Sequence, residues 1–202
     1  MNHLKKIAVI GYGGFAREVA CNLKKGTYNF FVNKQYINSD NISILKPLEE
    51  IDINNYRALV AIGNPLLRKK IIESLPFGIE HYTFIDNRAI LLDKDTINIG
   101  EGSIITAGTV ITTNINIGKF SHLNLNTTVG HDSNLGDFLT TTPGVHISGE
   151  TNIGKYAYFG CGAVVKNKIN ICDNVTVGMN SVVNKDITES GVYVGAPIKK
   201  IK

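Results

Sequence analysis

The chain has 202 residues, of which 43% are hydrophobic and 19% are charged, and its formal net charge is +4. These values are typical of a soluble globular protein that is long enough for one or two domains with a substantial core. The positive charge is mild and scattered, apart from Lys199, Lys200 and Lys202. No basic surface rich in aromatic residues is indicated, so we expect no nucleic-acid partner.

Cysteine usage and the N-terminal stretch indicate the compartment. Cys21, Cys161 and Cys172 are too few and too widely spaced for a disulfide framework or a zinc site. The apolar run 7–10 is too short for a signal peptide, and no stretch is long enough to span a membrane. We therefore expect a cytoplasmic protein with no bound metal and no membrane partner.

Residues 1–80 are predicted to form a Rossmann-like α/β domain with a small parallel sheet. The segment "KKIAVIGYGGFAREVACNLKK" is typical of a strand, a glycine loop and a helix, and "YRALVAIGNPLLRKKIIESL" repeats this order. Parallel βαβ units bind ligands at the carboxyl ends of their strands. We therefore expect a ligand site at that edge of the sheet.

The first glycine loop leaves the ligand open. Gly11, Gly13 and Ala16 fit the dinucleotide pattern G-x-G-x-x-A, but the acidic residue expected about twenty positions later is absent. Asn33 and Lys34 stand there instead. We favour a nucleotide-type ligand; a loop that only turns the chain and an NAD site for redox chemistry are the alternatives.

Residues 81–96 are predicted to link this domain to the next one. Asp86 and Arg88 lie in this segment. We interpret them as an ion pair or as solvated positions in preference to substrate contacts.

Residues 97–187 repeat with a period of eighteen that contains a shorter period of six. Asn recurs every eighteen residues, at positions 98, 116, 134, 152 and 170. Each Asn is followed by Ile or Leu. The next residue is Gly in four of the five cases and Cys172 in the last. Every sixth position is Ile, Leu, Val or Phe, with Thr141 as the exception: 99, 105, 111, 117, 123, 129, 135, 141, 147, 153, 159, 165, 171, 177 and 183.

This period predicts a left-handed parallel β-helix, a triangular prism with three short strands in each eighteen-residue coil. One aliphatic residue per side points inward, and Gly or Asn at the corners accepts positive φ. Coils stack at about 4.8 Å, so each residue lies above the one eighteen positions earlier. Residues 188–202 remain as a C-terminal tail.

His131 and Asp132 follow Gly130 in "NTTVGHDSNLGDF" and interrupt a pattern of small and apolar residues. At a corner, both side chains can face outward and form a hydrogen bond. Such a carboxylate fixes the imidazole tautomer and raises its basicity, as a general base requires. A surface histidine beside a surface aspartate is the alternative.

The stacking rule places Gly149 one coil above His131. A glycine there leaves open space beside the imidazole, and its N–H could bind a developing oxyanion. The same rule places His122 beneath Thr140 and His146 above Thr128. We expect both histidines to be structural or to lie at an interface.

Over nearly its whole length the chain resembles the hexapeptide acyltransferases that acetylate bacterial sugars, the PglD-like and NeuD-like proteins. These include N-acetyltransferases of nucleotide-linked 4-amino-4,6-dideoxy sugars and sialic acid O-acetyltransferases. The resemblance rests on five motifs: "VIGYGGFAREV", "VAIGNPLLRKKI", "NTTVGHDSNLGDF", "PGVHISGETNIG" and "VYVGAPIKKI".

The resemblance implies roles for individual residues. His131 would be the general base, Asp132 its partner, and the Gly149 amide would face the thioester carbonyl of acetyl-CoA. The pantetheine arm of acetyl-CoA would run past Gly160 and Cys161, and its adenosine end would lie near Gly178 and Met179. The full set of residues implied for acetyl-CoA binding is Thr140, Gly149, Gly160, Cys161, Gly178 and Met179. Nucleotide-sugar binding is implied for Gly11, Gly13, Gly14, Phe15, Asn33, Lys34 and Gly63. Family members form trimers with the active site between neighbouring prisms, so a homotrimer is implied as well.

Two departures from the family pattern leave details open. Some members carry a second histidine nine residues after the base, where this chain has Thr140. Some members carry acidic residues in place of Asn33 and Lys34, so the nucleotide is not identified.

The function that we expect is acetyl transfer from acetyl-CoA to the 4-amino group of a nucleotide-linked sugar, and O-acetyl transfer to a sialic-acid-type sugar is the closest alternative. A carbonic anhydrase would need three histidines that share a metal, and His122, His131 and His146 do not form a stacked set. A scaffold without activity would not depend on His131.

Overall fold

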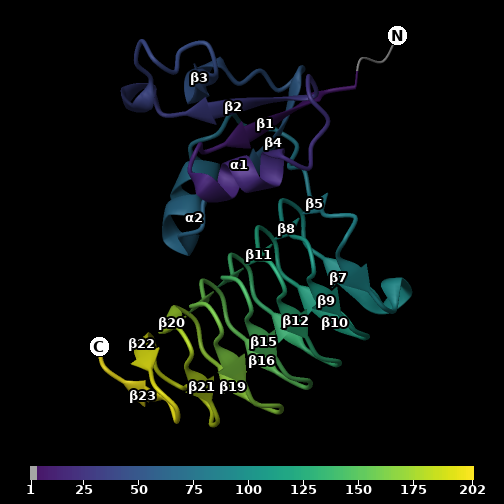
Figure 1. Ribbon diagram of the computed structural model, residues 1–202, viewed down its shortest axis with the longest axis vertical. Helices are drawn as coiled ribbons and strands as arrows, with labels where there is room; N and C mark the ends of the chain where they lie inside the picture. Colours follow the sequence, from purple (N-terminus) through teal and green to yellow (C-terminus); the bar gives the residue numbers. More distant parts are fainter. Residues whose placement is uncertain (1–3) are drawn as a thin grey trace. The chain divides into compact units, whose positions relative to one another are not determined.

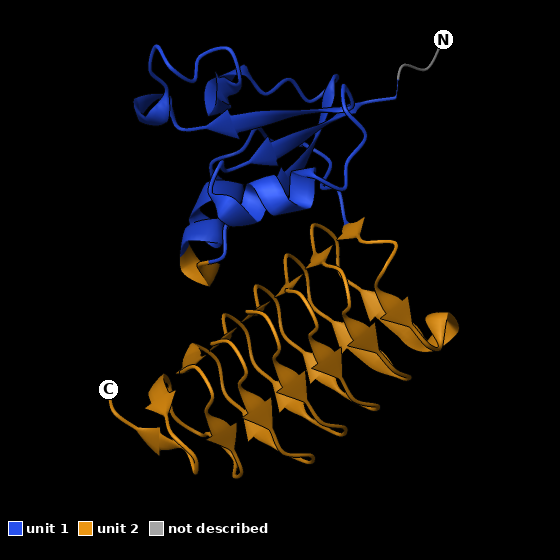
Figure 2. Ribbon diagram, viewed as in Figure 1, with its two compact units in different colours: residues 1–63, 67–83 blue, residues 64–66, 84–202 orange. Residues whose placement is uncertain are grey.

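The computed structural model describes residues 4–202; Met1–His3, part of the first predicted domain, lie outside the described residues. The chain divides into two compact units, Met1–Gly63 with Leu67–Thr83, and Asn64–Leu66 with Phe84–Lys202 (Figure 1, Figure 2). Among the described residues, no helix has the length and apolar character that crossing a membrane requires.

The first unit is the small α/β domain that the sequence predicts. Its elements are β1 (Lys6–Ile10), α1 (Gly14–Ala20), β2 (Tyr28–Val32), η1 (Lys34–Tyr36), β3 (Leu45–Pro47), η2 (Leu48–Glu50), β4 (Tyr56–Val60) and α2 (Pro65–Glu73). The strands form a parallel sheet in the order β3-β2-β1-β4. β4 therefore returns to the other side of β1, which places a topological switch point, where such sheets bind ligands, between these two strands.

Buried apolar residues hold this unit together. In β1 and β4 nearly every side chain is buried, because helices or loops cover both faces of a parallel sheet. Ala8, Phe31 and Ala58 are fully buried in the core, and α1 contributes Ala16 and Val19. The sheet therefore gives a fixed base for the loops at its carboxyl edge.

The second unit is a stack of coils whose short strands form three parallel sheets, as a left-handed β-helix requires. The five-stranded sheet contains β7 (Ile97–Ile99), β10 (Ile115–Ile117), β13 (Asn134–Leu135), β16 (Asn152–Ile153) and β19 (Asn170–Ile171). The six-stranded sheet contains β6 (Ile90–Leu91), β9 (Val110–Ile111), β12 (Thr128–Val129), β15 (His146–Ile147), β18 (Val164–Val165) and β21 (Val182–Val183). The eight-stranded sheet contains β5 (Phe84–Ile85), β8 (Ile104–Ile105), β11 (His122–Leu123), β14 (Thr140–Thr141), β17 (Tyr158–Phe159), β20 (Val175–Val177), β22 (Gly191–Val194) and, antiparallel at its edge, β23 (Lys199–Lys200).

The predicted register is confirmed. Strand partners lie eighteen residues apart, so His122 pairs with Thr140 and Thr128 with His146. Of the predicted inward positions, all but the half-buried Ile99 are at most 4% exposed. The period of six therefore identifies the prism interior.

Each corner contains a residue with positive φ, and this conformation recurs every sixth position from Gly102 to Asn180. We name the corners by their residues: the aromatic corner (Gly102, Phe120, Phe138, Tyr156, Asn174), the small-residue corner (Gly108, Asn126, Gly144, Gly162, Asn180) and the polar corner (Asn114, Asp132, Glu150, Lys168). The expectation of Gly or Asn at the corners is wrong at six of these positions, which carry aromatic or charged residues.

Contacts between coils compensate for this conformation, which is unfavourable by roughly 1–2 kcal/mol for a residue with a side chain. At the aromatic corner, the ring centroids of Phe120 and Phe138 lie 5.3 Å apart, as do those of Phe138 and Tyr156. Such ring pairs contribute about 0.5–1.5 kcal/mol each. The corner thus accepts a side chain where the next coil offers it a partner.

An exposed ladder of asparagine amides runs along the five-stranded sheet. Each side-chain NH₂ donates to the carbonyl oxygen of the next Asn, at distances of 2.9–3.1 Å, from Asn98 to Asn170. The Asn170 amide donates in turn to the carboxylate of Asp186 at 3.4 Å.

The predicted boundaries differ from the structure at both ends of the prism. The predicted linker 81–96 contains β5, β6 and η3 (Lys94–Thr96), which begin the stack. Phe84 pairs with Ile104, an offset of twenty, and Val175 pairs with Gly191, an offset of sixteen. A search for a period of eighteen therefore reaches neither the first coil nor the predicted tail, residues 188–202, which contains β22 and β23.

The glycines of the repeat are required by stacking. A Cβ at Gly136 would lie 2.6 Å from the carbonyl carbon of Gly154, and those at Gly100, Gly118 and Gly154 would also meet backbone atoms one coil on. Cys172 takes this place where the offset changes, and it packs against the core. We call these five stacked positions the glycine column: 100, 118, 136, 154 and 172. Only the last of them has room for a side chain.

We expect Gly136→Ala to lower the free energy of unfolding by about 1–3 kcal/mol, because two coils must move apart to accept the methyl group. Cys172→Ala, the control in the same column, should change it by less than about 1 kcal/mol. Urea titration of both variants measures the difference. Equal stability of the two variants would contradict this explanation of the glycine column.

Candidate active site

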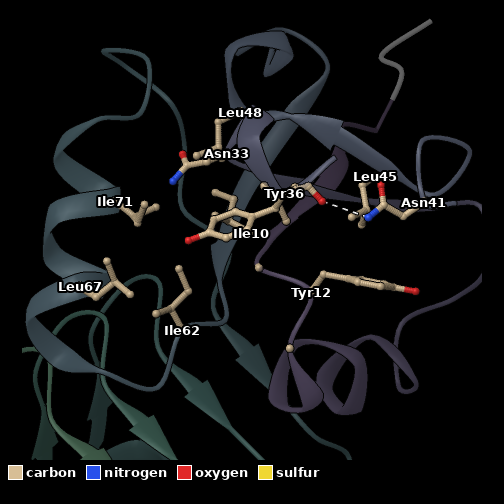
Figure 3. Close-up of a pocket in the computed structure, with 13 residues that line it drawn as sticks. Ile10, Tyr12, Asn33, Tyr36, Asn41, Leu45, Leu48, Ile62, Leu67 and Ile71 are labelled. Carbon is tan, nitrogen blue, oxygen red and sulfur yellow. Dashed lines mark hydrogen bonds between the residues drawn. The ribbon is translucent and has the colours of Figure 1, made fainter. Parts of the chain in front are cut away.

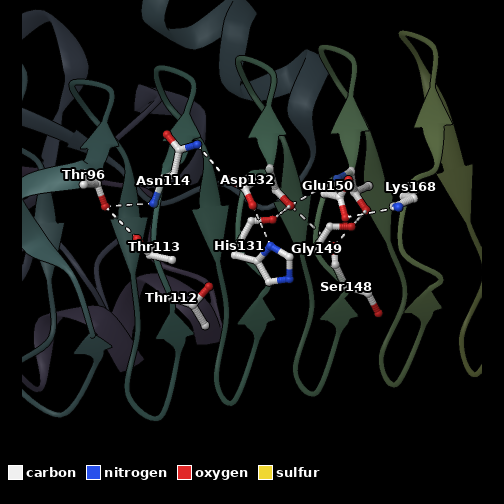
Figure 4. A network of polar contacts seen from close by, with 12 residues as sticks. Thr96, Thr112, Thr113, Asn114, His131, Asp132, Ser148, Gly149, Glu150 and Lys168 are labelled. Carbon is white, nitrogen blue, oxygen red and sulfur yellow. Dashed lines mark hydrogen bonds and ion pairs between the residues drawn. The ribbon is translucent and has the colours of Figure 1, made fainter.

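His131 and Asp132 lie at the polar corner and form a hydrogen-bonded pair (Figure 4). His131 Nδ1 lies 2.7 Å from Asp132 Oδ2, and the two side chains are 56% and 48% exposed. Asp132 is the corner residue itself, with φ of 59°, which turns its carboxylate back to the preceding residue. The Nδ1 contact leaves Nε2 available to a substrate.

Gly149 lies beside the imidazole, as the stacking rule predicts, but the expected open space is not there. A Cβ at Gly149 would lie 2.8 Å from His131 Nε2, so the ring itself occupies the space that the missing side chain leaves. Among residues 4–202, no acceptor receives a hydrogen bond from the Gly149 N–H. A donor without an acceptor therefore lies next to the histidine.

Asn114 is a third member of this group that the sequence analysis did not include. Its side-chain NH₂ donates to Asp132 Oδ1 at 2.7 Å. The Asn114 amide and, after it, the His131 ring hold the pKa of the Asp132 carboxyl below its usual range. The eighteen-residue rule could have found Asn114, because it stands one coil below Asp132.

The polar contacts continue along the corner in both directions. On one side the Asn114 N–H donates to Thr96 Oγ1 at 2.8 Å, and Thr96 Oγ1 donates to Asp93 Oδ2 at 2.9 Å. On the other side Glu150 and Lys168 form an ion pair at 3.6 Å. The candidate base therefore lies within a row of hydrogen bonds that crosses several coils (Figure 4).

The residues implied for acetyl-CoA binding lie on different edges of the prism. Gly160 and Cys161 are at the small-residue corner, one coil from Gly178 and Met179, and Met179 is 73% exposed. A Cβ at Gly160 would lie 2.6 Å from Met179 N, so these two coils are in contact. Thr140 is 4% exposed in the eight-stranded sheet. Of the implied acetyl-CoA residues, Gly149 alone lies beside His131; within one chain, the other five do not share a corner with His131.

The other predicted histidines of the β-helix lie in sheets. His122 is 1% exposed in β11, and His146 Nδ1 lies 2.9 Å from Thr128 Oγ1 on the outer face of the six-stranded sheet. Among the described residues, no three His, Cys, Asp or Glu side chains are close enough to hold a metal ion together.

The first unit has a pocket of about 360 Å³ at the carboxyl edge of its sheet (Figure 3). It lies at the ends of β1 and β2 and reaches the loop after β4 and helix α2, where the topology predicts a ligand site. The lining consists mostly of apolar side chains with a few polar ones: Ile10, Gly11, Tyr12, Gly13, Val32, Asn33, Tyr36, Asn41, Leu45, Leu48, Ile62, Leu67 and Ile71. Tyr36 and Asn41 were not predicted as pocket residues. The only signal for them in the sequence is their position after β2.

The predicted nucleotide-sugar residues fall into two groups. Gly11, Gly13 and Asn33 line the pocket. The other four lie next to it but outside its lining: Gly14 and Phe15 in α1, Lys34 in η1 and Gly63 in the loop after β4. Gly11 has φ of +108°, a conformation that only glycine adopts readily, and a Cβ there would meet Ala61 O at 3.2 Å. At Gly13, Gly14 and Gly63 an added Cβ would meet nothing within 4 Å.

Arg68 fixes the loop after β4. Its side chain is fully buried and donates to the carbonyl oxygens of Ile62 at 2.6 Å and Gly63 at 3.2 Å. Burial lowers the pKa of Arg68 to about 9, so the guanidinium stays charged at neutral pH. The loop that borders the pocket is therefore held from within the domain.

Comparison with known proteins agrees with this architecture. Residues 6–75 match the family model of the PglD N-terminal domain. The first unit is therefore similar to a PglD N-terminal domain over most of its length. The residues that line the pocket at the carboxyl edge of its sheet all fall in the matched range, and the resemblance inferred from the sequence is confirmed. No curated protein sequence matches the chain.

Solved structures match the chain over both the first unit and the β-helix that follows it. The acetyltransferase domain of PglB from Neisseria gonorrhoeae FA1090 is 29% identical, with a TM-score of 0.87 over 98% of this chain and 100% of that chain. WeeI from Acinetobacter baumannii AYE gives the same identity, TM-score and shares of the two chains. PerB from Caulobacter crescentus, solved in complex with CoA and GDP-perosamine, is 25% identical, with a TM-score of 0.84 over 99% of both chains.

Asp86 and Arg88 form the ion pair that the sequence analysis favoured. Arg88 Nε and a terminal guanidinium nitrogen donate to the two carboxylate oxygens of Asp86, both at 2.9 Å. The Asp86 side chain is 1% exposed and that of Arg88 is 61% exposed. Hydrogen bonding from Arg88 lowers the pKa of the Asp86 carboxyl.

A lowered pKa in the folded state means that Asp86 stabilises the protein above the usual Asp pKa of about 3.9, and that this contribution is lost as the pH falls through the lowered value. We expect Asp86→Asn to lower the free energy of unfolding by about 1–3 kcal/mol near neutral pH. The difference from the wild type should shrink at acid pH. Urea titrations across this range measure it, with Asp95→Asn, an exposed position of the same unit, as the control. A difference that does not change with pH would contradict the role of the ion pair.

Proposed function

We propose that this protein is an acetyl-CoA-dependent N-acetyltransferase that modifies the 4-amino group of a nucleotide-linked 4-amino-4,6-dideoxy sugar. One observation carries the proposal: the His131–Asp132 pair lies beside the Gly149 N–H, for which residues 4–202 offer no acceptor. The match of 98% of the chain to the PglB acetyltransferase domain supports it.

His131 acts as the general base. A neutral imidazole whose Nδ1–H is donated to Asp132 keeps a lone pair on Nε2, and this atom accepts a proton from the attacking amine. The ring is more than half exposed, so a sugar from solvent can reach it. Asp132 stabilises the imidazolium that forms, as the carboxylate of a catalytic triad does.

The Gly149 N–H stabilises the tetrahedral intermediate. The amine nitrogen bonds to the thioester carbon, negative charge develops on the carbonyl oxygen, and a preorganised backbone donor is favourable there. When the intermediate collapses, the C–S bond breaks and the proton held by His131 passes to the CoA thiolate. No covalent enzyme intermediate is needed, so Cys161 is not a nucleophile.

The first unit binds the nucleotide part of the substrate. Its pocket of about 360 Å³ is mostly apolar, with the Asn33 amide directed into it to hydrogen-bond a base or ribose (Figure 3). The relative PerB was solved with CoA and GDP-perosamine, which supports a nucleotide-linked amino sugar as the acceptor.

The active form is a homotrimer in which a neighbouring prism completes the site. This explains why the acetyl-CoA residues other than Gly149 lie on different edges of one chain from His131. The outer face of the six-stranded sheet supports a subunit interface, because it is largely apolar: Ile90, Val110, Thr128, His146, Val164 and Val182.

The first experiment is a thiol-release assay with acetyl-CoA and a panel of acceptors: UDP-, dTDP- and GDP-linked 4-amino sugars and free sialic acid. We expect turnover of one nucleotide-linked amino sugar, and mass spectrometry of the product should show one added acetyl group. Turnover of sialic acid alone would replace the proposal by O-acetylation. Failure with every acceptor would remove the proposed substrate class.

We expect His131→Asn to lower kcat by about 10²–10⁴-fold, because the base is lost while the corner stays folded. Asp132→Asn should lower kcat as well, because the imidazole loses the carboxylate that orients it. Asp137→Asn, beside the aromatic corner, is the matched control and should keep the wild-type rate. Steady-state kinetics with both substrates measure these effects, and a wild-type kcat in His131→Asn would contradict the mechanism.

A further inference from the structure

We propose that Asn114 is a positioning residue that orients the Asp132 carboxylate and, through it, the His131 ring. The inference rests on the proposed function only for the role of His131 as base. The two oxygens of Asp132 have different partners: Oδ2 faces His131 Nδ1, and Oδ1 accepts from the Asn114 amide, each at 2.7 Å.

Packing alone does not hold this pair in place. His131 and Asp132 are each about half exposed, so their side chains keep rotational freedom that a buried pair would lack. Hydrogen bonds must therefore fix the geometry. With Asn114 on one oxygen, the carboxylate plane is set and the other oxygen stays directed at the imidazole.

Asn114 is itself held by its backbone. It adopts φ of 51°, which Asn tolerates better than most residues, and its N–H donates to Thr96 Oγ1. Thr96 Oγ1 and Thr113 Oγ1 both donate to Asp93 Oδ2, at 2.9 and 2.8 Å. The amide thus projects from an anchored turn, as a positioning group requires (Figure 4).

The charges along the corner explain why this residue is a neutral donor. Asp132 and Glu150 are stacked neighbours of like charge, and Lys168 pairs with Glu150. Asp93 lies on the other side of Asn114, beyond Thr96 and Thr113. A carboxylate at position 114 would place three acids in succession, whereas an amide donates a hydrogen bond and adds no charge.

Two substitutions of Asn114 separate these effects. Asn114→Asp keeps the size and tolerates positive φ but replaces the donor with a negative charge, and Asn114→Gly keeps the backbone and removes the side chain. Asn174→Asp and Asn174→Gly are matched controls, because Asn174 has φ of 58° at the aromatic corner.

We expect both Asn114 variants to lower kcat by about 10–100-fold with KM values within about twofold of the wild type, since a displaced base slows the reaction without weakening binding. In Asn114→Asp, the acidic limb of the pH profile of kcat/KM should also move to higher pH, because the added carboxylate stabilises the imidazolium. The Asn174 variants should match the wild type in kcat, KM and profile.

Nitrogen-15 NMR of the histidines tests the positioning without any substrate. In the wild-type chain, neutral His131 should be a single tautomer protonated at Nδ1; in Asn114→Gly, both tautomers should be populated. If the wild type transfers no acetyl group, the proposed function fails and this measurement alone decides the inference. An unchanged tautomer in Asn114→Gly overturns it, even if kcat falls, because the residue would then be only structural.

Discussion

The stacking of one coil on the next at an offset of eighteen residues is the constraint on which the rest of the β-helix depends. Each position must suit the residue above and below it. The glycine column exists because backbone atoms of the next coil occupy the space of a Cβ. Beside the aromatic corner, Glu101, Lys119, Asp137 and Lys155 alternate in charge, and successive members form ion pairs or hydrogen bonds.

The same constraint assembles the candidate site. Asn114, Asp132 and Glu150 are far apart in the chain but stacked in space, and Gly149 provides the place where the His131 ring lies. The site therefore lies on an exposed edge of the prism. An exposed edge can present a base to a large substrate, but hydrogen bonds along the stack must supply the rigidity that a buried site obtains from packing.

The two units contribute different kinds of recognition. The first unit offers a mostly apolar pocket where parallel strands end, and the position of this pocket follows from the strand order. The β-helix offers polar groups in rows at its corners. The substrate class that we propose, a nucleotide-linked amino sugar, has two ends that differ in the same way.

Much of this could be predicted from the sequence, because a period of eighteen specifies partners directly. The contact between Gly149 and His131 could be predicted from their separation of eighteen residues alone. The rest depends on features that break the period: Phe84 and Gly191 pair at offsets of twenty and sixteen, so the first and last coils were missed. Tyr36, at the end of η1, and Asn41, in the turn after it, line the pocket from a segment with no repeat and no motif. The positive φ at Phe138 depends on the stacked rings of Phe120 and Tyr156, which outweigh the usual preference for glycine.

The ladder of asparagine amides on the five-stranded sheet has a direction. Every NH₂ donates toward the C-terminal end, and the last one meets the carboxylate of Asp186, which can only accept while it is ionised. The orientation of one amide fixes that of the next, and aligned hydrogen bonds polarise one another. A single acidic side chain at the end therefore sets the polarity of five amides, and the face of the prism carries an oriented row of dipoles without a formal charge on any of them.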